Sequence, residues 1–125
     1  MKTILLIEDY ADNARLVMRA LKPYDYRVLH AVDGETGLMM AVDEQPDLIL
    51  LDLGLPDVEG QTLVSLIRNA PGLEQVPIIA VTAWPPATAR RMVEAYGCNS
   101  YISKPISPKT FPSQIAAYFA PEDDE

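Results

Sequence analysis

The chain has 125 residues, a formal net charge of −8 and one cysteine, Cys98. A chain of this length buries roughly two-thirds of its unfolded surface as one domain, so we expect a single domain at 1–120 and an acidic tail at 121–125. The charge argues against nucleic acid as a direct partner, and the lone cysteine excludes an internal disulfide. No apolar run approaches the roughly 18 residues of a membrane span. We therefore expect no membrane partner and a cytoplasmic location.

The first part of the chain predicts two strand–helix units. Residues 3–7 form a short unbroken apolar run, which favours a buried strand. From residue 11 to Pro23, apolar side chains recur every three or four positions, as in an amphipathic helix. A weaker strand is expected at 27–31, and Asp33 is a suitable N-cap for a helix at 35–44.

The strongest predicted strand is 48–52, four aliphatic residues followed by Asp52. Such a run is typical of a strand buried on both faces of a parallel sheet. The pattern continues with a helix at 57–68, a strand at 76–82, a helix at 86–95 and a strand at 101–103.

The last predicted helix extends to about residue 119 and contains an internal proline. Ser107 is expected to be its N-cap, with Pro108 at the first helical position. Pro112 should make this helix begin late or kink, because proline removes a backbone donor and clashes with the preceding turn.

Strict alternation of strands and helices predicts a three-layer α/β domain, in which helices cover both faces of a parallel sheet. Its connections should be right-handed crossovers. Ligands of such sheets bind at the carboxyl ends of the strands. Five residues with reactive or charged side chains lie at those ends: Glu8, Asp9, Asp52, Thr82 and Lys104.

If the first and third strands are neighbours, the three carboxylates crowd one cleft. Like charges at that distance raise one another's pKa unless a cation is present. A hard divalent ion such as Mg²⁺ prefers carboxylate oxygens and retains waters that a phosphate can replace. Metal, ammonium and hydroxyl groups together hold phosphoryl oxygens, and a carboxylate is the nucleophile available to form an acyl phosphate.

The pattern Glu8-Asp9, Asp52, Thr82-Ala83 and Lys104-Pro105 resembles the receiver domain of two-component response regulators. The resemblance covers residues 2 to about 119, and the segment 101–107 is similar to single-domain receivers of the cell-cycle type. It implies a doubly wound, flavodoxin-like fold with five helices and five parallel strands in the order 2-1-3-4-5. A cis peptide bond before Pro105 is also implied.

The resemblance also implies roles for individual residues. Asp52 would accept a phosphoryl group from a sensor histidine kinase or a phosphotransferase. Mg²⁺ would be bound by Asp9, Asp52 and the Gly54 carbonyl, and by Glu8 through a water. The phosphoryl group would be contacted by Lys104, Thr82 and Ala83.

Signal output is expected through a conformational switch of Thr82 and Tyr101. The output face would consist of the fourth helix, fifth strand and fifth helix, and the same face is a possible homodimer contact. The downstream protein target is unknown. Two further residues are expected to modulate access of water to the phosphoryl group: Trp84, which would restrict it, and Gly54, which has no side chain to do so.

Two other functions remain open at this point. A pseudo-receiver would bind a partner without phosphorylation, and Pro85-Pro86 favours this by stiffening the loop after Thr82. A phosphohydrolase of the haloacid-dehalogenase type would turn over an aspartyl phosphate, but it needs an acid where this chain has Gly54. Considered alone, an aspartate after a strand is more often a turn cap than a nucleophile. A strand tyrosine such as Tyr101 is a packing residue at least as often as it is a switch residue.

Overall fold

The structure, a computed structural model, describes residues 1–119. The predicted acidic tail at 121–125 lies outside the described residues. The strands are β1 (Lys2–Ile7), β2 (Tyr26–Ala31), β3 (Leu48–Asp52), β4 (Ile78–Thr82) and β5 (Ser100–Ser103). The helices are α1 (Ala11–Leu21), α2 (Gly34–Glu44), α3 (Gly60–Arg68), α4 (Pro86–Tyr96) and α5 (Phe111–Ala116).

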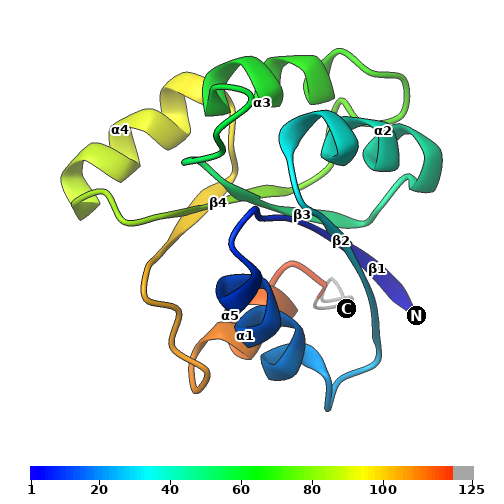
Figure 1. Ribbon diagram of the computed structural model, residues 1–125, viewed down its shortest axis with the longest axis vertical. Coiled ribbons are helices and arrows are strands. Elements are labelled where there is room, and N and C mark those ends of the chain that lie inside the picture. Colours follow the sequence, from blue (N-terminus) through cyan, green and yellow to red (C-terminus); the bar gives the residue numbers. More distant parts are fainter. Residues whose placement is uncertain (120–125) are drawn as a thin grey trace, which may run out of the picture.

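The five strands form one parallel sheet in the order β2-β1-β3-β4-β5, which confirms the expected topology. Helices α1 and α5 cover one face of the sheet, and α2, α3 and α4 cover the other (Figure 1). All five residues of β3 and all five of β4 are buried. The central position of these strands explains why their sequences are unbroken apolar runs.

Two apolar cores lie on the two faces of the sheet. Alternate residues of β1 contribute to each core, with Leu5 and Ile7 on the α2 side and Ile4 and Leu6 on the α1 side. The period of two follows from the pleat of the strand, in which successive side chains point to opposite faces. This packing fixes the sheet register, and the register fixes which residues meet at the carboxyl edge.

The start of α2 is held by two aspartates. Asp33 caps the helix as predicted, because its Oδ1 accepts a hydrogen bond of 2.8 Å from the Thr36 N–H. Asp57 adds a second cap from the loop after β3, accepting from the Gly34 N–H at 3.0 Å and the Glu35 N–H at 3.1 Å. These N–H groups hold the pKa of Asp57 below its usual range. Helix α3 therefore begins at Gly60, not at Asp57 as expected.

The last helix begins later than Ser107. Thr110 is at the N-cap position, and the chain at 108–110 forms a turn, so the expected Ser107 cap is wrong. Pro112 is the second residue of α5, where its missing N–H costs no intrahelical bond. The late start expected from Pro112 is confirmed. Among residues 1–119, no helix combines the length and apolar character needed to cross a bilayer.

Candidate functional site

Three carboxylates converge at the carboxyl edge of the sheet. Strands β1 and β3 are neighbours, with Ile7 paired to Leu51, so the residues that follow β1 lie beside the end of β3. One carboxylate oxygen from each of Glu8, Asp9 and Asp52 lies within 4.8 Å of the others. Glu8 is 2% exposed and Asp52 is 6% exposed, whereas Asp9 is exposed. The expected acidic cluster is therefore present.

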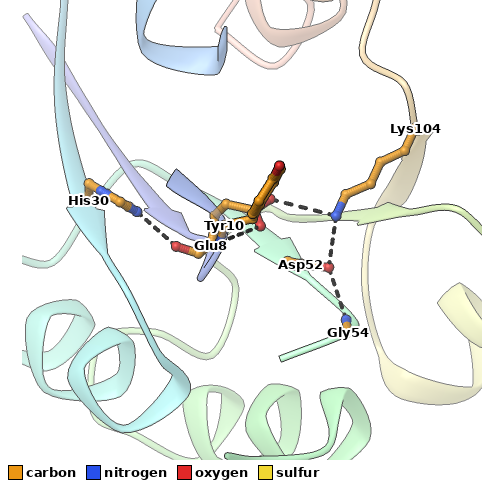
Figure 2. A network of polar contacts seen from close by, with 6 residues as sticks. All are labelled: Glu8, Tyr10, His30, Asp52, Gly54 and Lys104. Atoms are coloured by element: carbon orange, nitrogen blue, oxygen red, sulfur yellow. Dashed lines mark hydrogen bonds and ion pairs between the residues drawn. The ribbon is translucent and has the colours of Figure 1, made fainter. Parts of the chain in front are cut away.

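Lys104 lies against the two buried carboxylates (Figure 2). Its Nζ is 3.3 Å from Asp52 Oδ1 and 3.7 Å from Glu8 Oε1. The peptide bond that follows it, to Pro105, is cis, as the resemblance implies. The side chain thus brings one positive charge from the end of β5 to the end of β3.

Backbone N–H groups also bond the same two carboxylates. The Tyr10 N–H donates to Glu8 Oε2 at 3.2 Å, and the Gly54 N–H donates to Asp52 Oδ1 at 2.9 Å. No N–H group of residues 1–119 donates a hydrogen bond to the second oxygen of Asp52. Asp52 is therefore held in orientation through Oδ1, and no N–H group of the described residues occupies its Oδ2.

The charges of the cleft are unbalanced. Burial, and after it the adjacent charge of Asp52, raises the pKa of Glu8 to about 7 against the opposing effects of the Tyr10 N–H and Lys104. One ammonium group faces two desolvated carboxylates, and Asp9 adds a third acid at the rim. An oxygen-only donor set with excess negative charge suits a hard divalent cation. The residues present therefore fit Mg²⁺.

The end of β4 supplies a hydroxyl group to the same cleft. Thr82 is buried, and its Oγ1 accepts a hydrogen bond of 3.0 Å from the Trp84 N–H. A hydroxyl that accepts in this way still has its own proton to donate. The Thr82 side chain is thus held in place and remains able to donate to an oxygen in the cleft.

The cleft has a volume of about 290 Å³ and collects most of the predicted site residues. Its lining residues are Glu8, Asp9, Tyr10, Asn13, Asp52, Leu53, Gly54, Thr82, Ala83, Trp84 and Lys104. Tyr101 is not among them. It is half-buried on β5 and lines a separate hollow with Ser103 and Thr110.

Sequence reasoning missed three residues near the acids. Tyr10 and Asn13 line the cleft, and their place in or just before the first turn of α1, directly after Glu8-Asp9, is the signal that could have found them. The third is His30, whose Nε2 lies 2.8 Å from the Glu8 carbonyl oxygen. Nothing in the local sequence around His30 indicates this contact, because it joins β2 to the loop after β1, which is distant in the sequence.

Comparison with known proteins identifies the family. A family model for the response regulator receiver domain matches residues 4–116. The polar-differentiation response regulator DivK of Brucella anthropi is 32% identical over 117 residues, which cover 94% of this chain and 95% of that protein.

Solved structures agree with this match. A response regulator from Chloroflexus aurantiacus superposes with a TM-score of 0.88 at 28% identity, covering 96% of this chain and 98% of that one. The receiver domain of a sensor histidine kinase from Pseudomonas aeruginosa gives a TM-score of 0.84 at 30% identity, covering 94% and 96%. That structure holds a magnesium ion in its active-site cleft. The chain belongs to the response regulator receiver family, and it is a DivK-like receiver domain of two-component signalling.

Proposed function

We propose that this receiver accepts a phosphoryl group on Asp52 from a phosphohistidine of a sensor kinase or a phosphotransferase. The observation that carries the proposal is the position of Asp52. Its Oδ1 is held by Lys104 and the Gly54 N–H, and its Oδ2 accepts no hydrogen bond from an N–H group of the described residues. In the transfer, a carboxylate oxygen of Asp52 forms a bond to phosphorus as the phosphorus–nitrogen bond breaks. The electron pair of that bond stays on the departing imidazole, which takes up a proton.

The neighbouring side chains would bind the oxygens of the transferred group. Lys104 supplies a positive charge to one oxygen, and the Thr82 hydroxyl and the Ala83 N–H donate to another. Preorganised hydrogen-bond donors that face the negative charge of the transition state lower the barrier to phosphoryl transfer most in a site that excludes water. Thr82 is suited to this task because its hydroxyl is already oriented by the Trp84 N–H.

Mg²⁺ would be held by Asp9, Asp52 and the Gly54 carbonyl, and by Glu8 through a water. When bound, it supplies positive charge to the phosphoryl oxygens. The support is the fit of the acidic cluster described above, together with the magnesium ion in the cleft of the Pseudomonas aeruginosa receiver domain. The net negative charge of this cleft is the reason that a phosphoryl group would need the cation before it could approach.

Output would follow from a shift of Thr82 toward the phosphoryl group, with Tyr101 moving in response. Tyr101 is half-buried on β5 beside Ala80 of β4, so a change at the end of β4 reaches its neighbourhood directly. The surface formed by α4, β5 and α5 would then contact a downstream protein or a second copy of the chain. A phosphorylation switch of this kind biases a two-state element.

The test is incubation with acetyl phosphate and Mg²⁺, followed by intact mass measurement. We expect a mass increment of one phosphoryl group in the native protein, and none in Asp52→Asn or when Mg²⁺ is chelated. An increment that persists in Asp52→Asn would contradict the assignment of the acceptor. No increment in a native protein that binds Mg²⁺ would favour the pseudo-receiver, which acts through partner binding alone.

The lifetime of the phosphoryl group should depend on Trp84. Trp84 lines the cleft and is 37% exposed, whereas Gly54 leaves open space: a Cβ at this position would have only Asp52 Oδ1 within 4 Å, at 3.6 Å. We expect Trp84→Ala to admit water and accelerate dephosphorylation about threefold, equivalent to ~0.7 kcal/mol of barrier. Decay of the phosphorylated mass after removal of acetyl phosphate measures the rate. Trp84→Phe, which keeps an aromatic cover, is the matched control, and an unchanged rate in Trp84→Ala would refute the role.

A further inference from the structure

His30 faces the α1 side of the sheet next to the acidic loop. It is the next-to-last residue of β2 and is paired in register with Leu6 of β1. Paired residues of adjacent strands point to the same face, so the imidazole lies on the side where Leu6 and Val28 contribute to the core. From there its Nε2 lies 2.8 Å from the Glu8 carbonyl oxygen (Figure 2). Since a carbonyl oxygen only accepts, Nε2 carries the hydrogen and donates.

This hydrogen bond replaces one that the sheet does not supply. The Glu8 N–H continues the β1–β2 ladder by donating to the Ala31 carbonyl at 3.0 Å. In a parallel ladder, the N–H two residues after Ala31, that of Asp33, would next donate to the Glu8 carbonyl. Asp33 instead caps α2, and within residues 1–119 no backbone N–H donates to this oxygen. Glu8 is almost fully buried, so without His30 its carbonyl would lack a partner at the cost of an unpaired polar group.

The carbonyl bonded by His30 belongs to the peptide that joins Glu8 to Asp9. The preceding peptide is fixed through the Glu8 N–H and the Ala31 carbonyl. Two consecutive peptide planes are therefore held by the last two residues of β2, and these planes set the directions of the Glu8 and Asp9 side chains. The directions matter because Glu8 must meet both Lys104 and the Tyr10 N–H through its two carboxylate oxygens.

We propose that His30 is a positioning residue that aims the Glu8-Asp9 pair at the cation site by bonding the peptide between them. The inference rests on the proposed function to the extent that these acids hold Mg²⁺. Outer groups that orient metal ligands typically contribute about 10- to 100-fold to metal affinity when removed. His30 acts one peptide further from the ion than such a group, so we expect an effect near the lower end of that range.

Two substitutions separate the hydrogen bond from the packing of the ring. His30→Leu retains a side chain of similar size against α1 and removes the donor. His30→Gln keeps an N–H donor at a similar reach. Thermal unfolding of each variant establishes that it is folded, and His30→Val, a β-branched residue suited to a strand, is a second donor-free variant if His30→Leu does not fold.

The first readout is Mn²⁺ binding, measured from the loss of the free-ion electron paramagnetic resonance signal. We expect His30→Leu to bind Mn²⁺ about tenfold more weakly than the native protein, and His30→Gln to lie within about twofold of it. The second readout is amide hydrogen exchange at Tyr10 in the metal-free protein, followed by NMR. We expect faster exchange in His30→Leu and restoration in His30→Gln, because the Tyr10 N–H is bonded to Glu8 Oε2.

The outcomes separate this inference from the proposed function. Unchanged Mn²⁺ affinity in folded His30→Leu, or equal weakening in His30→Gln, overturns the positioning role. If the native protein binds no Mn²⁺, the aiming of these acids at a cation is overturned, and the exchange at Tyr10 tests only whether His30 orients Glu8. If both readouts behave as expected but the native protein takes no phosphoryl group from acetyl phosphate, the proposed function fails and the role of His30 stands.

Discussion

Lys104→Met is expected to lower the rate of phosphoryl incorporation at Asp52 by about 100-fold or more. Within residues 1–119, Lys104 is the only basic side chain that lines the cleft, and its Nζ lies 3.3 Å from the proposed acceptor. The side chain is 22% exposed, so water replaces little of the lost charge. Removing one hydrogen-bond donor that stabilises the negative charge developing in a transition state typically lowers the rate by about 10²- to 10³-fold. The increase of the phosphorylated mass with time, at fixed acetyl phosphate and Mg²⁺, gives the rate.

Two further variants make this result specific. Lys109→Met removes an equal charge from an exposed position in the turn before α5 and should leave the rate unchanged. Lys104→Arg keeps the charge but replaces a compact ammonium with a planar guanidinium, so its rate should fall between those of the native protein and Lys104→Met. If Lys104→Met were phosphorylated within about threefold of the native rate, the transfer would not depend on this ammonium.

The centre of the sheet could be predicted because its inner strands carry clear local patterns. The buried runs at 3–7 and 48–51 and the acids that follow them place carboxylates at one edge of any parallel sheet. The order of the strands, and with it the pairing of β1 with β3, had to come from the family resemblance. Once that order holds, the convergence of Glu8, Asp9 and Asp52 follows from register alone.

The helix starts were harder to predict because caps depend on which loop reaches which helix. Aspartate is a residue type favoured at helix starts, which is why Asp57 was expected to begin α3. Its carboxylate is instead bonded to the first N–H groups of α2. Gly34 permits this contact, because a Cβ there would lie 2.8 Å from Val58 Cγ1. The same limit applies to His30, whose bond to the Glu8 carbonyl depends on where β2 ends and α2 begins.

Arg68 shows the same limit in a side chain that stabilises the fold. In sequence it is a basic residue at the end of a helix, a position where a cation interacts favourably with the helix dipole. In the structure its guanidinium donates to the carbonyl oxygens of Leu73, Val76 and Gly97 and to Asn99 Oδ1. It therefore joins the end of α3 to the segment before β4 and the segment before β5.

Arg68→Ala is expected to lower the free energy of unfolding by about 3 kcal/mol. A hydrogen bond that involves a charged group contributes about 1.5–3 kcal/mol, and bonds that share one side chain are not additive. The loss should loosen the amino ends of β4 and β5, which Asn99 joins by accepting from the Ile78 N–H at 2.8 Å and donating its own N–H to the Ile78 carbonyl at 2.8 Å. Urea unfolding, followed by the fluorescence of Trp84, measures the change as a lower midpoint.

Arg91→Ala is the matched control, because Arg91 is exposed on α4 and its guanidinium makes no hydrogen bond or ion pair with another of the described residues. It should shift the unfolding free energy by no more than about 0.5 kcal/mol. Arg68→Lys should recover only part of the loss, since one ammonium cannot reach acceptors on two connecting segments with the fork geometry of a guanidinium. Asp52 lies at the other end of the sheet, so folded Arg68→Ala should still be phosphorylated. Equal stability of Arg68→Ala and Arg91→Ala would show that the guanidinium contacts add nothing to the fold.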